Sequence, residues 1–226
     1  MSPVTQAARH FHEELARLKD RLLEMSGLAE ELVRTAVEAL LERDETKASA
    51  VVLGDREVDA LEVEIDDVCL QLLALQQPFA GDLRLITAAM RVTNDLERVG
   101  DHAVNIAQAA EALARAAPLA PPPQLEEMAR NARQMLSDAL DAFVRRDAAL
   151  AREIPQRDAR VDALHDSVTR HLLTQMMEEP RAIGAAMRYV GASGDLERVA
   201  DLATNIAEDT VFLIEGRTIR HHRDDG

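Results

Sequence analysis

The chain has 226 residues, a formal net charge of −15 at pH 7 and few aromatic residues, which make up 2% of the sequence. Its apolar fraction of 47% therefore comes mainly from Ala, Leu, Val, Ile and Met, which favours helices because strands are enriched in aromatic and β-branched residues. The negative charge repels phosphate backbones and anionic lipid, so we expect neither nucleic acid nor bare membrane as a partner. No run of about 18 apolar residues and no signal-peptide core occurs, which predicts a cytoplasmic protein without direct membrane insertion.

Apolar residues recur at helical spacing in three segments on each side of a proline-rich run. The predicted helices cover residues 11–41, 48–76, 82–115, 124–146, 148–178 and 181–215. Pro78 and Pro180 separate the last two helices of each half, and Pro155 interrupts or delays the fifth helix. The run from Pro118 to Pro123, with three consecutive prolines, predicts a stiff linker.

The two halves are copies of one unit. DLERVGDHAVNIA over residues 95–107 and DLERVADLATNIA over residues 195–207 differ at three positions. Upstream, DREVDALE from Asp55 matches DARVDALH from Asp158. We therefore predict an all-α fold of two pseudo-symmetric three-helix bundles, six long helices in all. The first repeat is expected over residues 1–117, the linker over 118–123 and the second repeat over 124–226.

Acidic side chains in each half fall at matching distances from the predicted turn. In an antiparallel hairpin, residues equally far from the turn lie at the same height, and the midpoint between Asp59 and Glu97 is residue 78. Asp55 and Asp101 share that midpoint, so two carboxylates on each helix, spaced i, i+4, face one patch. The second half repeats the arrangement with Asp158, Asp162, Glu197 and Asp201.

Four carboxylates on one small patch repel each other, so a cation there would stabilise the fold. All-oxygen ligand sets suit hard cations such as Mg²⁺, Ca²⁺, Mn²⁺ or oxidised iron, rather than the Cys and His sets of structural zinc. The alternative is a solvated acidic face, neutralised by Arg98, Arg198 and bulk counter-ions. The residues alone leave both interpretations open.

The sequence around these carboxylates resembles the PhoU family, the accessory protein of bacterial phosphate-specific transport. The resemblance is carried by the ERVxDxAxNIA blocks at residues 97–107 and 197–207, by the preceding DxxVDxL motifs and by the ending IEGRTIRHH. It extends over nearly the whole chain, including FHEELARLKDRLLEMSGLAEE near the start. It implies two three-helix bundles related by pseudo-twofold symmetry and, often, a homodimer.

The resemblance also implies metal-binding acidic motifs, because such proteins hold multinuclear metal clusters on them. The implied ligands are Asp55, Asp59, Glu97 and Asp101 in the first half and Asp158, Asp162, Glu197 and Asp201 in the second. Asn105 and Asn205 extend the two sets. His165 stands where the first half has Glu62, so the two sites are expected to differ in metal preference or occupancy. Iron, manganese, magnesium and zinc are the candidate ions.

Proteins that resemble this chain regulate rather than catalyse. The resemblance implies that the chain restrains phosphate uptake and the phosphate-starvation response by contacting the ATPase of the phosphate ABC transporter and its partner sensor histidine kinase. The transporter would recruit it to the membrane periphery, and Arg98 and Arg198 are candidate partner contacts. The sequence shows no glycine-rich phosphate loop and no Ser/His/Asp or Cys/His set on facing elements, so we expect no enzyme activity.

Two rival interpretations remain. A ferritin-like di-metal oxidase needs Glu-x-x-His on two helices, and the nearest match is Asp162-x-x-His165, whose first-half counterpart ends in Glu62. A metal-free helical scaffold that binds its partners by charge alone needs none of these ligands.

Overall fold

The computed structural model describes residues 3–75 and 80–217, and all regular structure in them is helical. Its elements are α1 (Pro3–Glu42), α2 (Glu45–Leu75), α3 (Ala80–Ala114), α4 (Pro123–Arg145), α5 (Ala148–Glu153), α6 (Pro155–Glu178), a 3₁₀ turn η1 (Pro180–Ala182) and α7 (Ile183–Glu215). α5 and α6 together form the fifth helix expected from the sequence, so the all-α prediction with six long helices is confirmed. Within the described residues, no helix is long and apolar enough to cross a membrane.

The hairpin that opens each repeat is built in the same way. Arg43 and Arg146 both adopt the left-handed backbone conformation, with φ of 57° and 54°, and end the first helix of their repeats. Asp44 and Asp147 follow, and each side chain accepts hydrogen bonds from two backbone amides of the next helical turn. These caps satisfy amides that a helix start leaves unpaired. The repeat therefore extends beyond the acidic motifs to the turn chemistry.

Prolines set the starts of later helices. Pro123 and Pro155 are the first residues of α4 and α6. A proline has no backbone N–H, and at the first position of a helix this costs no hydrogen bond, because that N–H has no acceptor within the helix. The non-helical connection before α4 therefore ends at residue 122, and the break between α5 and α6 falls at Ile154. Pro180 begins η1 at the second predicted turn, whereas Pro78, at the first predicted turn, lies outside the described residues.

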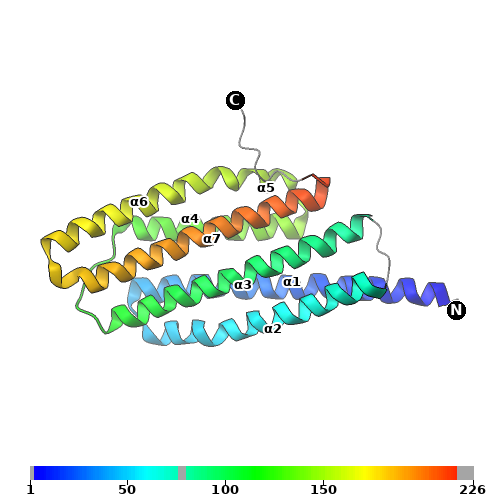
Figure 1. Ribbon diagram of the computed structural model, residues 1–226, viewed down its shortest axis with the longest axis horizontal. Helices are drawn as coiled ribbons and strands as arrows, with labels where there is room; N and C mark the ends of the chain where they lie inside the picture. Colours follow the sequence, from blue (N-terminus) through cyan, green and yellow to red (C-terminus); the bar gives the residue numbers. More distant parts are fainter. Residues whose placement is uncertain (1–2, 76–79, 218–226) are drawn as a thin grey trace, which may run out of the picture.

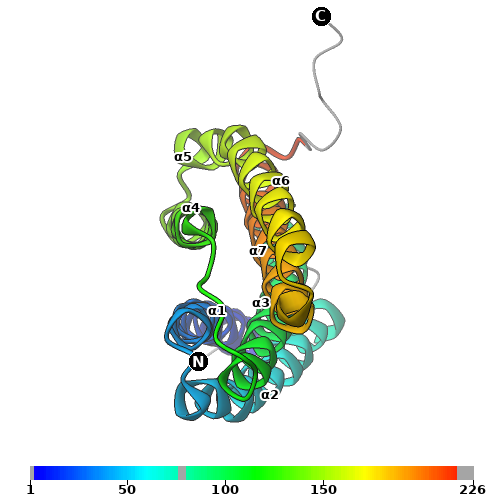
Figure 2. The ribbon, with the colours of Figure 1, turned by 90° about the vertical axis from the view of Figure 1, so that its left-hand side faces the viewer.

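The molecule is an elongated bundle whose central helices, α3 and α7, run antiparallel (Figure 1). α1 and α2 pack on α3, while α4 and α6 pack on α7, so each repeat forms its own three-helix unit. Seen from the end, α1 and α4 lie on the same side of the central pair (Figure 2). The arrangement has the pseudo-twofold symmetry that the sequence repeat predicts.

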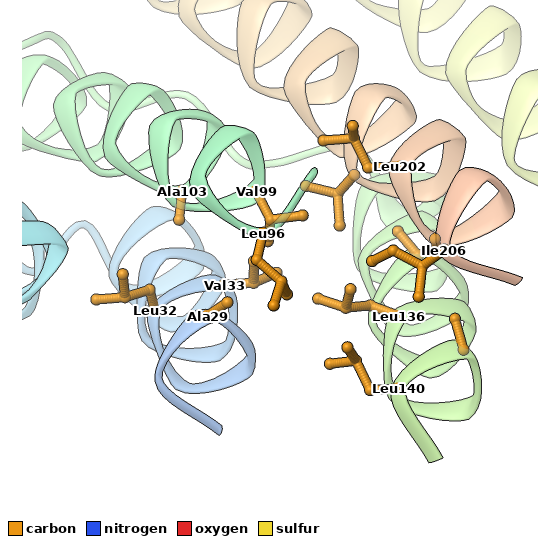
Figure 3. Close-up of a cluster of buried hydrophobic side chains, with 14 of the residues drawn as sticks. Ala29, Leu32, Val33, Leu96, Val99, Ala103, Leu136, Leu140, Leu202 and Ile206 are labelled. Atoms are coloured by element: carbon orange, nitrogen blue, oxygen red, sulfur yellow. The ribbon is translucent and has the colours of Figure 1, made fainter. Parts of the chain in front are cut away.

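One hydrophobic core runs through both repeats. At its centre, Leu96 and Val99 of α3 cluster with Val33 of α1, Leu136 of α4 and Leu202 of α7 (Figure 3), and each of these side chains is at most 2% exposed. Burying a side chain of this size stabilises the fold by about 1.5–3 kcal/mol. The two repeats therefore stabilise each other, and α3 and α7 are held with one face in the core.

Leu96→Ala should lower the free energy of unfolding by about 2–5 kcal/mol, because it leaves a cavity where a fully buried side chain was. Chemical denaturation followed by circular dichroism measures the change. Leu53→Ala is the matched control, since Leu53 is 60% exposed on α2 and its truncation should cost less than about 0.5 kcal/mol. Equal losses for the two variants would contradict the placement of Leu96 in a shared core.

Candidate metal-binding site

The acidic motif residues of α3 and α7 lie on the outer face of the central helices. Leu96 and Val99 turn into the core (Figure 3), so Glu97 and Asp101, one helical turn apart, face away from it. The same motif on α7 gives the same alternation of buried and accessible residues. Both sets of carboxylates therefore lie on the side of the central pair opposite α1 and α4.

In the first repeat, carboxylates of α2 and α3 interact electrostatically. Burial raises the pKa of Asp55 from 3.8 to about 6, and the charges of Asp59 and Asp101 add to the rise. Burial raises the pKa of Glu62, with further contributions from aspartates that include Asp59 and Asp101. Burial also raises the pKa of Glu97, followed by the charges of Asp101, Glu62, Asp59 and Asp55. The structure thus brings these five residues together, and we call them the first acidic cluster.

Gly100 lets the first acidic cluster close tightly onto α3. A Cβ atom at this position would lie 2.4 Å from Oδ1 of Asp55, so any larger residue would force that carboxylate to move. The second repeat has the fully buried Ala200 at the equivalent position, where a Cβ atom is already present. Sequence reasoning missed this role, although Gly100 is one of the positions at which the two motifs differ.

The second acidic cluster consists of Asp158, Asp162, His165, Glu197 and Asp201. Ser193 donates its hydroxyl proton to the carbonyl of Val190 (2.8 Å), so its oxygen accepts a hydrogen bond from Nδ1 of His165 (3.1 Å). Neutral His165 then carries its lone pair on Nε2, which lies 3.8 Å from Oε2 of Glu197. Two acceptors therefore face each other, and a proton or a cation between them would relieve their repulsion.

The other residues predicted from the sequence are less closely involved in the two acidic clusters. Arg198 pairs with Asp201 at 2.9 Å and partly neutralises the second cluster, whereas Arg98 approaches Asp95 at 4.0 Å. Asn205 is partly buried on α7. Across residues 3–75 and 80–217, no three His, Cys, Asp or Glu side chains converge on a single point. The donor sets suit a cation chemically, but their side chains must turn to surround one.

Sequence reasoning also missed the polar contacts that tie α3 to α7. Nδ1 of His102 lies 2.9 Å from Oδ1 of Asp195, which accepts a further hydrogen bond from Asn105 at 3.1 Å. Asn105 therefore joins this contact between repeats rather than the first acidic cluster. Arg91 pairs with the buried Asp209 at 3.0 Å. A signal existed, because His102 and Arg91 both differ in residue type from their counterparts in the other repeat.

The amino-acid sequence is similar to those of known proteins. A family model described as the PhoU domain matches the chain twice, over residues 22–110 and 125–210. The chain belongs to the PhoU family. It is 39% identical over 216 residues to the phosphate-specific transport system accessory protein PhoU homolog of Pseudomonas putida, a match that covers 95% of this chain and 84% of that protein. It is 37% identical over 209 residues to the homolog of Aquifex aeolicus, covering 92% of this chain and 95% of that protein.

Solved PhoU structures share the fold. The crystal structure of PhoU from Pseudomonas aeruginosa matches with a TM-score of 0.88 at 38% identity, covering 92% of this chain and 100% of that one. The phosphate transport system regulatory protein PhoU from Streptococcus pneumoniae matches with a TM-score of 0.85 at 32% identity, covering 92% and 99%. PhoU proteins are accessory regulators of phosphate-specific transport and not enzymes, which excludes the di-metal oxidase interpretation.

The raised pKa of Asp55 predicts a pH-dependent stability in the metal-free protein. The folded chain holds this proton more tightly than the unfolded chain, so ionisation removes stability as the pH rises from about 4 to about 6. After chelator treatment, Asp55→Asn should therefore raise the melting temperature at pH 7 and change it little at pH 4. Calorimetry measures both, with Asp67→Asn, an exposed residue of α2, as control. No gain at pH 7, or an equal gain at both values, would contradict the assignment.

Proposed function

We propose that this chain restrains phosphate uptake and the phosphate-starvation response. The support is its membership of the PhoU family and the names of its relatives, which tie those proteins to the phosphate-specific transport system. In this proposal it contacts the ATPase of the phosphate ABC transporter and a sensor histidine kinase. It acts in the cytoplasm as a homodimer that the transporter recruits to the membrane. Its net charge of −15 suits basic protein surfaces as partners.

The acidic clusters are, in the same proposal, metal sites. One observation carries this part, the raised pKa values of Asp55, Glu62 and Glu97. Carboxylates whose ionisation is opposed by burial and by each other's charge are stabilised by a cation, whose charge also displaces their protons. The ligands would be Asp55, Asp59, Glu97 and Asp101 in the first cluster and Asp158, Asp162, Glu197 and Asp201 in the second. When bound, the ion would supply positive charge that holds α2 against α3 and α6 against α7.

The two clusters offer different donors to such an ion. Glu62 keeps the first set all-oxygen, which suits magnesium, manganese or oxidised iron. His165 adds an imidazole nitrogen to the second set, which also suits zinc. Asn105 and Asn205 are additional ligands only if their side chains turn, and Asn105 would have to leave Asp195.

A metal-free scaffold is the second candidate. It is favoured because, in the part of the chain that the structure describes, no three potential ligands are gathered at one point. It is also favoured by Arg198, which pairs with Asp201 without any ion. In that case the acidic clusters bind partner proteins directly, and Arg98 and Arg198 are partner contacts.

The double variant Glu97→Gln/Asp101→Asn should lose metal from the first cluster and keep it in the second. Elemental analysis of protein purified without chelators measures occupancy. Added Mn²⁺ should raise the wild-type melting temperature, since a ligand that binds only the folded state stabilises it by RT ln(1 + [L]/Kd). The variant should lose part of that rise. Glu57→Gln/Asp67→Asn, which neutralises two exposed carboxylates of α2, should keep it in full.

Wild-type protein that carries no metal and gains no stability from Mn²⁺ would contradict the proposed metal sites and favour the metal-free scaffold. In that outcome the double variant should be as stable as the wild type or slightly more stable, because relief of like-charge repulsion is worth about 0.2–0.5 kcal/mol per pair.

Recruitment to the membrane should depend on the phosphate transporter. The described residues contain no helix that could cross a membrane, so a membrane-bound partner must hold the chain there. Fractionation of cells with and without the transporter, followed by quantitative immunoblotting, measures the dependence. We expect the chain to leave the membrane fraction when the transporter is deleted, and equal association in both strains would contradict the proposed partner.

A further inference from the structure

The tip of the α6–α7 hairpin exposes large apolar side chains. Met177 is 85% exposed, Met187 54%, Leu173 52% and Ile183 45%. Leu173 and Met177 are one turn apart on α6, and Ile183 and Met187 are one turn apart on α7, so each pair lies on one side of its helix. We call these four residues the tip patch.

The two helices present the tip patch at matching heights. The pair Leu173 and Met187 and the pair Met177 and Ile183 are both centred on Pro180, the residue that begins the turn. Residues equally far from a hairpin turn lie level, so Leu173 lies at the height of Met187 and Met177 at the height of Ile183. Exposed apolar side chains that cluster in this way mark interaction sites in soluble proteins, whereas isolated ones need no explanation.

The tip patch continues into the second acidic cluster on the same face of the hairpin. Asp162 and Leu173 are three turns apart on α6, and Ile183 and Asp201 are five turns apart on α7, so each pair lies on one side of its helix. His165 and Glu197 face each other across the hairpin at 3.8 Å, so both pairs of residues lie on one side. An apolar end and an acidic end therefore share one continuous surface.

The first repeat carries part of the same pattern. Leu70 and Leu83, which are 56% and 42% exposed, occupy the positions of Leu173 and Ile183. The two hairpin tips lie at opposite ends of the molecule (Figure 1). Exposed apolar residues at equivalent places of both repeats indicate a property of the unit, rather than an accident of one turn. The turn of the first hairpin, residues 76–79, lies outside the described part of the chain, so the inference concerns the second hairpin.

We propose that this face of the α6–α7 hairpin docks one amphipathic helix of a partner protein, with apolar residues at one end of that helix and basic residues at the other. The tip patch takes the apolar end, and the second acidic cluster takes the basic end by charge complementarity. Between Asp162 and Met177, α6 rises roughly 22 Å, which matches about 15 residues of a bound helix.

Charge favours a partner helix over two other occupants of an apolar tip, a lipid membrane and a second copy of the chain. Side chains beside the tip patch are of mixed sign, with Glu178 and Glu179 against Arg181 and Arg188, so the strong field comes from the acidic end. Anionic lipid would be repelled by that end. A second copy docked through this same face would bring a second acidic cluster close to the first, so the proposed homodimer uses another surface.

The inference rests on the proposed function in one respect, because it takes the chain to act by binding proteins. It does not need the clusters to hold metal, but it needs the second acidic cluster to remain net negative. The proposed function and the docking face can be tested separately. If deletion of the chain has no effect on a phosphate-starvation reporter, the proposed function is wrong. Binding of a defined peptide tests the docking face.

The probe is a fluorescent synthetic helix of 18 residues, with leucines at i, i+4 spacing in one half and lysines in the other. Fluorescence anisotropy with the full chain should show saturable binding that weakens as salt rises. Met177→Gln/Ile183→Gln should weaken it by roughly tenfold or more, because a few apolar anchors supply most of the binding energy of such an interface and Gln makes them polar. Leu53→Gln/Val63→Gln, which changes two residues of α2 that are 60% and 63% exposed, should leave it unchanged.

Equal binding by the two double variants would overturn the proposal, and so would equal affinity for a peptide with glutamates in place of the lysines. A fall in the sedimentation mass of Met177→Gln/Ile183→Gln would assign the tip patch to a second copy instead. Loss of co-sedimentation with phosphatidylglycerol vesicles in that variant alone would assign it to a membrane. Both results overturn the partner helix, and circular dichroism confirms that the surface variants remain folded.

Discussion

The antiparallel contact between α3 and α7 is the constraint on which the rest of the structure depends. Val99 and Val199, both fully buried, mark its middle, and the polar contacts of Arg91 and His102 with α7 lie on either side of it. The acidic motif residues lie within two positions of these valines, so helix geometry places them at the middle of the molecule on the outer face. The contact that joins the two repeats therefore also positions both clusters.

The two clusters at this position differ in their construction. In the first, Gly100 admits Asp55 against the backbone, and the pKa of Asp55 rises to about 6. In the second, the buried Ala200 stands at the equivalent position, and His165, which is hydrogen-bonded to Ser193, faces the carboxylate of Glu197. One fold thus presents two sites of different donor chemistry. We expect the metal, if the sites hold one, to differ in identity or occupancy between them.

Helical periodicity and turn residues made most of the fold predictable from the sequence. The features that the sequence did not predict depend on contacts between the two repeats. Helical periodicity placed the third helix at residues 82–115, against Ala80–Ala114 in the structure, and distance from the turn paired Asp59 with Glu97. Periodicity cannot reveal that Asp195 of one repeat holds His102 and Asn105 of the other. Nor does it show whether another helix covers an apolar residue. The helices and the grouping of carboxylates in the first repeat could therefore be predicted, whereas the role of Gly100 and the exposed hairpin tip could not.

The central claim is that a cation relieves the repulsion among carboxylates that this fold holds together. Calorimetric titration of the chelator-treated protein with Mn²⁺ at pH 6, in two buffers of different ionisation enthalpy, tests it most directly. Because the pKa of Asp55 is about 6, about half of the molecules carry a proton on Asp55 at that pH, and a bound cation must displace this proton. We predict saturable binding with a heat that depends on the buffer. No binding, or the same heat in both buffers, would contradict the claim.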